Sequence, residues 1–171
     1  MRLRSRLVHC AVGVRVGPIV RADASAAIRA GTQCQQRDYR GWDAGVMHGL
    51  LSAALAPVMA DLRATGGPLP MVDDEDWVDD PEYASAMLRG PDGGGFGITV
   101  RLAAAECDRI ASVADKVQEW AIEELWSRSA TNWPPCPVHP DSHPLAALNR
   151  NGVARWVCPS DPTALAPIGS L

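Results

Sequence analysis

The feature that most constrains this chain is a group of four metal-ligand residue types near its C-terminus. Two residues separate Cys136 from His139, three separate His139 from His143, and fourteen separate His143 from Cys158. Thiolate sulfur and imidazole nitrogen are typical ligands of tetrahedral zinc in proteins. The Cys136-Pro-Val-His139 segment can also form a tight turn whose backbone amides hydrogen-bond the thiolate. The spacing therefore predicts a zinc site formed by Cys136, His139, His143 and Cys158.

The residues around these ligands predict a small antiparallel β unit. Residues 143–148 and 153–157 have strand-like composition and are joined by the turn sequence Asn149-Arg-Asn-Gly152. Residues 163–168 can add a third short strand. This hairpin would return Cys158 to the neighbourhood of the other ligands.

The size of this unit explains why a metal would matter for its stability. A unit of about forty residues buries too little apolar surface to be stable alone. A structural zinc contributes about 10–16 kcal/mol of apparent binding energy in small peptides. Asp161 follows Cys158 at turn spacing and is the alternative to His143 as fourth ligand. The competing interpretation is a proline-rich tail with buried thiols and solvent-facing imidazoles.

The motifs Cys-Pro-x-His, His-Pro-Leu and Trp-Val-Cys-Pro resemble a zinc-ribbon variant. With the flanking residues 120–136 and 166–169, the pattern is similar to uncharacterised small actinobacterial proteins that carry a C-terminal zinc-ribbon-like module. The resemblance covers roughly residues 47–171, and it implies a recurring architecture without an established activity. The chain departs from an ordinary ribbon at its second turn, which reads Cys158-Pro-Ser-Asp161 instead of Cys-x-x-Cys.

Apolar periodicity upstream of this unit predicts a first helix over residues 43–65. Asp43 can cap its start, and Gly66-Gly67 can end it with positive backbone φ. Pro57 lies inside the helix and predicts a kink or a break into two short helices. His48 is predicted to be a partly exposed surface residue and not a ligand.

Two strands and a second helix follow. The strands cover residues 83–89 and 96–102 and are joined by a turn rich in glycine, which is typical of a hairpin. The helix covers residues 103–129, with an apolar stripe that has Trp120 at its margin and a predicted Glu124–Arg128 pair on its outer surface.

The fold class is therefore α+β: two helices packed with a β-hairpin, plus a small C-terminal zinc-ribbon-like β unit. The predicted organisation is a flexible basic leader at 1–41, an α+β body at 42–130 and the zinc-ribbon-like module at 131–171. Residues 12–20 could form a short strand in the leader. Translation starting at Met47, where periodicity begins, is an alternative.

Charge and composition narrow the possible partners. Eight arginines and two aspartates give residues 1–40 a charge of +6. Because the net charge of the chain is −4, the remaining residues carry −10. An acidic body does not favour nucleic acid, which is bound through clustered Lys and Arg. No apolar run reaches the ~20 residues that span a bilayer. Five cysteines, an odd number, indicate a reducing and therefore cytoplasmic location.

The preferred hypothesis is a non-enzymatic protein-binding or assembly protein stabilised by one structural zinc. Its partner would be another protein, contacted by the acidic body and by exposed tryptophans. The acidic run at 73–82 is predicted to be a solvated loop. The alternative for this run is a partner-docking segment with Trp77 as anchor. One alternative is a nucleic-acid-associated zinc-ribbon protein. Another is a zinc-dependent hydrolase with three protein ligands and Asp141 or Glu124 as general base.

Overall fold

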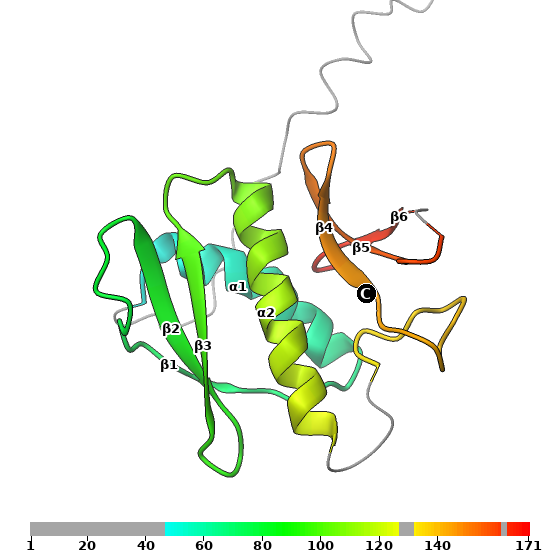
Figure 1. The fold of residues 1–171 in the computed structure, drawn as a ribbon, viewed down its shortest axis with the longest axis horizontal. Helices are drawn as coiled ribbons and strands as arrows, with labels where there is room; N and C mark the ends of the chain where they lie inside the picture. Colours follow the sequence, from blue (N-terminus) through cyan, green and yellow to red (C-terminus); the bar gives the residue numbers. More distant parts are fainter. Residues whose placement is uncertain (1–46, 127–131, 162–163) are drawn as a thin grey trace, which may run out of the picture. The chain divides into compact units, whose positions relative to one another are not determined.

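The computed structural model describes residues 47–126, 132–161 and 164–171. These residues form two helices and two antiparallel three-stranded sheets, with strand orders β1-β2-β3 and β4-β5-β6 (Figure 1). The predicted leader at 1–41, its strand at 12–20 and the capping residue Asp43 lie outside the described residues. In chain order the elements are α1 (Gly49–Ala64), β1 (Met71–Asp73), β2 (Tyr83–Arg89), β3 (Gly95–Arg101), α2 (Glu106–Trp126), β4 (Ala146–Arg150), β5 (Val153–Val157) and β6 (Ala164–Pro167).

Helix α1 begins later than predicted, because His48 is its N-cap. The exposed His48 ring accepts a hydrogen bond from the Leu50 backbone N–H at 3.2 Å through Nδ1. The predicted glycine end is confirmed: Gly66 has a φ of 69°, and the Gly67 N–H bonds the Leu62 carbonyl at 2.8 Å. Pro57 does not break the helix, which continues as one element through it.

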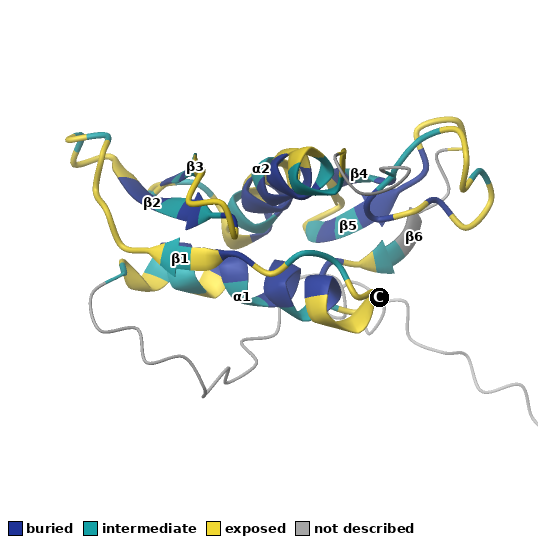
Figure 2. Cartoon of the chain, turned by 90° about the horizontal axis from the view of Figure 1, so that it is seen from below, coloured by how far each residue is buried: buried dark blue, intermediate teal, exposed yellow. Residues whose placement is uncertain are grey.

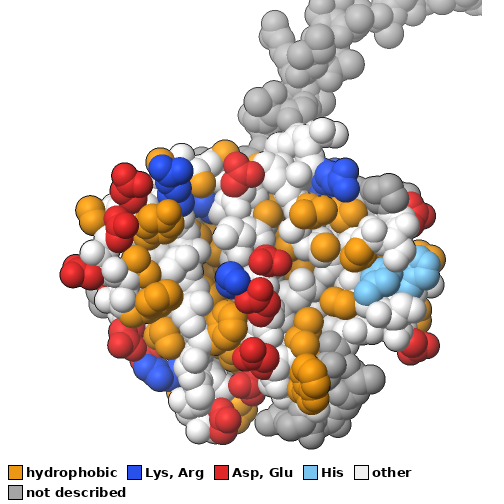
Figure 3. Space-filling model, in the orientation of Figure 1, with side chains coloured by type: hydrophobic (Ala, Val, Ile, Leu, Met, Phe, Trp, Pro, Cys, Tyr) orange, Lys and Arg blue, Asp and Glu red, His pale blue; other side chains and the backbone are white. Residues whose placement is uncertain are grey.

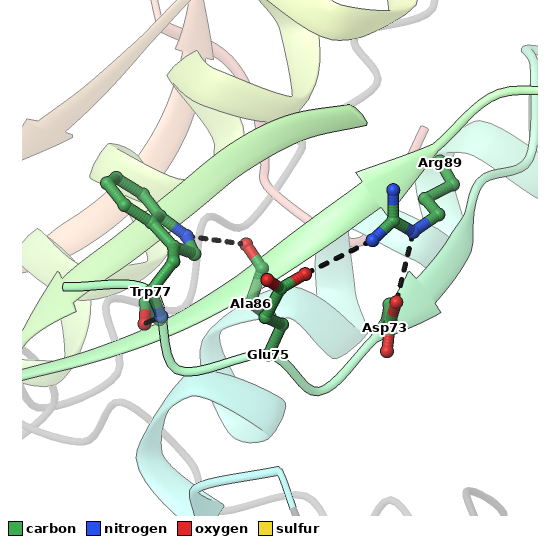
Figure 4. A network of polar contacts seen from close by, with 6 residues as sticks. Asp73, Glu75, Trp77, Ala86 and Arg89 are labelled. Atoms are coloured by element: carbon green, nitrogen blue, oxygen red, sulfur yellow. Dashed lines mark hydrogen bonds and ion pairs between the residues drawn. The ribbon is translucent and has the colours of Figure 1, made fainter. Parts of the chain in front are cut away.

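The predicted hairpin is part of a three-stranded sheet. Its strands pair from Tyr83↔Arg101 to Arg89↔Gly95, as expected. The acidic run at 73–82 is mostly an exposed loop, as the solvated-loop interpretation predicts. Only its first residue, Asp73, belongs to a strand, because β1 ends there and pairs with β2. The Arg89 guanidinium bonds Asp73 at 3.0 Å and Glu75 at 3.1 Å, so a cross-strand ion pair ties this segment to the sheet (Figure 4).

Trp77 lies against the same sheet. Its indole N–H donates to the Ala86 carbonyl at 3.3 Å (Figure 4). Its ring also lies over Gly97 of β3, where a Cβ would come within 2.5 Å of the ring. The side chain is still 48% exposed. Trp77 therefore fastens the acidic segment to its own sheet and leaves one part of the ring accessible.

Helix α2 is the central element, since it packs against α1, β3, β4 and β5 (Figure 1). Trp120 is only 2% exposed, so it belongs to the core and not to the margin of the apolar stripe. Arg128, the predicted partner of Glu124, lies outside the described residues; the Glu124 carboxylate lies against Gly90 and leaves no room there for a Cβ. No helix in the described part of the chain is long and apolar enough to span a membrane.

One hydrophobic core runs through both sheets and both helices, so it crosses the predicted boundary at residue 130 (Figure 2). Trp133 and Trp156 meet edge to face in this core, with ring centroids 5.5 Å apart. The indole N–H of Trp156 donates to Asp61 of α1 at 2.7 Å. The C-terminal unit is therefore joined to the helices by packing and by a buried hydrogen bond.

Candidate metal centre

The β4–β5 hairpin brings the predicted ligands together. Its turn has positive φ at Asn151 (54°) and Gly152 (79°), the backbone geometry of a tight type I′ hairpin. The register pairs Ala146 with Val157, so the residue before β4 lies opposite the residue after β5. Cys158 is the residue that follows β5, so it lies beside the segment that enters β4, as the sequence predicts.

The four predicted ligands lie close enough to hold a metal ion: one ligand atom from each of Cys136, His139, His143 and Cys158 lies within 4.8 Å of the others. His139 Nδ1 is 3.7 Å from the Cys136 sulfur and 3.4 Å from the Cys158 sulfur, and His143 Nε2 is 3.8 Å from the Cys158 sulfur. Zinc–sulfur bonds of about 2.3 Å and zinc–nitrogen bonds of about 2.0 Å place S and N about 3.5 Å apart in a tetrahedron. The observed separations bracket that value.

The sulfurs lie inside the protein and the rings lie at its surface. Cys136 and Cys158 are buried, whereas His139 and His143 are partly exposed. Histidine side chains are visible together at the surface near the loop that precedes β4 (Figure 3). A divalent cation here would balance the charge of two buried thiolates while the imidazoles close the site toward solvent.

Hydrogen bonds fix how the ligands are presented. The His143 Nδ1 lies 2.9 Å from the Pro144 carbonyl oxygen, which can only accept, so Nδ1 carries the proton and Nε2 offers its lone pair toward the cluster. His139 instead directs Nδ1 toward both sulfurs. The two histidines would therefore bind through different ring nitrogens. The Ser160 hydroxyl lies 3.2 Å from the same His143 Nε2.

Asp161 has a different place from the one considered for it. Its backbone N–H donates to the Cys158 sulfur at 3.3 Å, which is the amide–thiolate contact expected of a metal-binding turn. The close group of ligand atoms consists of Cys136, His139, His143 and Cys158, and the exposed Asp161 is outside it. Between His143 and Asp161, the geometry favours His143.

Further contacts hold the loop between the first and third ligands. The Ser142 N–H donates to the His139 carbonyl at 3.1 Å, and the Asn132 side chain donates to the Pro140 carbonyl at 2.9 Å. Asp141, one candidate base, is exposed on this loop. Glu124, the other, lies against the β2–β3 turn at Gly90 and is outside the close group.

Gln118, a buried residue on α2, is not among the residues predicted from the sequence. Its side chain donates to the carbonyls of Trp133 and Leu145, on either side of the metal loop, which is formed by residues 136–143. The available signal was its position in the apolar stripe of the helix, between Val117 and Ala121. A polar residue on a buried helix face needs a partner from another element.

Comparisons with protein-family models, with curated proteins and with solved structures find no match for this chain. The resemblance to actinobacterial proteins with a zinc-ribbon-like module therefore stays a prediction. What the chain can do is inferred from the geometry of its own residues.

Proposed function

We propose that the chain is a non-enzymatic protein-binding or assembly protein that holds one structural zinc ion through Cys136, His139, His143 and Cys158. The observation that carries the zinc assignment is a set of three S···N distances in this group, which measure 3.4, 3.7 and 3.8 Å. Two thiolates and two imidazoles suit zinc, whereas magnesium and calcium select oxygen ligands.

The position of the ligands also supports a zinc-ribbon-like module. The Cys136–His139 turn and His143 precede β4, and Cys158 follows β5 in the three-stranded sheet β4-β5-β6. Ribbon sites likewise place ligands on turns at the ends of short antiparallel strands. No disulfide joins Cys136 or Cys158, which agrees with the reducing, cytoplasmic location that we propose.

A structural role is favoured over a hydrolytic one. A catalytic zinc keeps a coordination position open for water, with a general base beside it. The four ligand atoms of this group are sufficient to complete a tetrahedron. Glu124 lies against the β2–β3 turn at Gly90. Asp141 lies on the loop between His139 and His143, but a base there would have no metal-bound water to activate once four protein ligands fill the tetrahedron.

A protein partner is favoured over nucleic acid. In residues 132–161, Arg150 and Arg155 are balanced by Asp141 and Asp161, so this unit offers no basic surface for phosphates. Exposed apolar side chains instead alternate with acids along residues 69–83, a composition that suits contact with another protein. The exposed apolar residues of this stretch are Leu69, Met71, Trp77 and Tyr83.

Elemental analysis of the purified full-length chain tests the zinc proposal. We expect about one equivalent of zinc per chain, and a large loss in Cys136→Ser, because a serine hydroxyl is a poor zinc ligand. Cys107→Ser is the matched control: Cys107 is also buried, but it lies outside the close group. Zinc-free wild type, or equal zinc in Cys136→Ser, would contradict the proposal.

Sedimentation and partner capture test the binding proposal on the zinc-loaded protein. We expect self-association or a defined partner that Met71→Glu weakens, because this substitution places a charge on the exposed apolar stretch. The exposed Leu148 on β4 supplies the control Leu148→Glu. A strictly monomeric protein without any partner would count against a role in binding or assembly.

A further inference from the structure

A buried glutamine on α2 connects the two segments that enter and leave the metal loop. Gln118 is 7% exposed, and its side-chain amide donates to the carbonyl oxygens of Trp133, at 2.8 Å, and of Leu145. Trp133 lies shortly before the ligand Cys136, and Leu145 lies shortly after the ligand His143. One side chain therefore holds both ends of the loop against the helix.

Prolines explain why these segments need a donor from another element. Pro135 and Pro144 form an antiparallel bridge, and next to it the Leu145 N–H donates to the Pro134 carbonyl at 2.9 Å. In such a pair the return bond would run from the N–H of residue 134 to the Leu145 carbonyl. Proline has no N–H. Gln118 supplies the donor that the backbone lacks.

We propose that Gln118 is a positioning residue for the metal centre, which sets the placement of Cys136 relative to His143 without touching the ion. This inference rests on the proposed zinc site. Residues that orient metal ligands through hydrogen bonds typically change metal affinity by about 10–100-fold when they are replaced. A residue that only stabilised the core would change the stability of the fold and leave metal affinity unaltered.

Gln118→Met tests the proposal in the full-length chain. Methionine has a similar length and flexibility but no donor, so the two carbonyls lose their shared partner. We expect zinc affinity, measured by competition with a chromophoric chelator, to fall by about 10–100-fold. We also expect the absorption spectrum of the cobalt-substituted protein to change, because it reports the arrangement of sulfur and nitrogen ligands.

Val113→Ala is the matched control. Val113 is fully buried on the same helix and is not one of the residues that contact the metal loop through hydrogen bonds. Its truncation should lower the melting temperature while zinc affinity stays within about twofold of wild type. If Gln118→Met melts earlier but binds zinc as tightly as wild type, Gln118 is only structural and the inference is wrong. If wild type binds no zinc, the proposed function fails as well.

A measurement on wild type covers the case in which Gln118→Met does not fold. If Gln118 positions the site, zinc must in turn stabilise the hydrogen bonds of Gln118, because coupling between two sites is reciprocal. We expect the side-chain amide protons of Gln118 to exchange with solvent more slowly in the zinc-loaded than in the metal-free protein. Equal exchange rates in the two forms would overturn the inference.

Discussion

At the scale of single residues, the Asp61 side chain connects α1 to the C-terminal part of the chain through hydrogen bonds. This carboxylate on α1 is 1% exposed and accepts from the Trp156 indole at 2.7 Å, the Gly169 N–H at 2.7 Å and the Leu171 N–H at 2.9 Å. Three donors from the C-terminal part of the chain converge on it. Asp61 therefore fastens that part to the helix.

We expect Asp61→Asn to destabilise the fold by at least about 2 kcal/mol. The NH2 of the new amide would face N–H donors that now bond the carboxylate, and each unpaired buried group costs about 1–3 kcal/mol. Urea unfolding measures this loss. Asp115→Asn, on the exposed face of α2, is the control and should stay within about 0.5 kcal/mol of wild type. Equal stability of the two variants would show that Asp61 does not hold the C-terminal segment.

At the scale of elements, the features that depend on neighbouring residues were predictable from sequence. The apolar periodicity of its residues predicted α2, and turn-forming residues predicted the β2–β3 and β4–β5 hairpins. The four residues that lie close enough to hold a metal ion were also predictable from local spacing, because each lies outside the strands, in a turn or next to a strand end. Strand β1 was missed because it is only three residues long, which is too short for an alternating apolar pattern to show in the sequence.

The contacts that support the candidate site were not predictable for a related reason. Gln118 hydrogen-bonds Trp133 and Leu145, which lie beyond the end of its helix, and Asp61 hydrogen-bonds the C-terminal residue Leu171. Such pairs depend on the tertiary arrangement of the helices, and sequence alone only marks both residues as polar side chains on helices with buried faces. His48 lies at the surface, as predicted, although it is more exposed than expected, and its capping role depends on where the helix begins.

The metal loop, residues 136–143, gives the prediction that belongs to this scale. Most of its side chains are exposed, and the Ser142 N–H donates to the His139 carbonyl, which forms one hydrogen-bonded turn. We expect the amides of Val138, His139 and Ser142 to exchange with solvent at least about tenfold faster after zinc removal, since segments with few buried contacts open most easily. Exchange measured by NMR at single residues tests this.

Amides in the middle of α2, such as those of Val117 and Ala121, are the internal reference for the same experiment. Both side chains are fully buried in the core, so their protection should persist without metal. Unchanged exchange across the loop would mean that the metal does not order it. Loss of protection in α2 as well would mean that the whole fold requires the metal.

At the scale of the whole molecule, the C-terminal unit does not depend on metal for all of its burial. A unit the size of residues 131–171, about forty residues, buries too little apolar surface to be stable alone. In the structure Trp133, Leu145 and Trp156 enter the same core as the residues of α1 and α2. This packing contributes stability that a small isolated unit would lack.

We therefore expect zinc removal by chelation to lower the melting temperature while leaving a single cooperative transition. Zinc at about 100 times its dissociation constant adds about 2.7 kcal/mol, which corresponds to a rise of roughly 5–10 °C for a chain of this size. Differential scanning calorimetry of loaded and metal-free protein measures the shift, and Cys136→Ser should match the metal-free form. Two separate transitions would show that residues 131–171 unfold as an independent domain. The absence of any transition without zinc would show that the shared core is insufficient by itself.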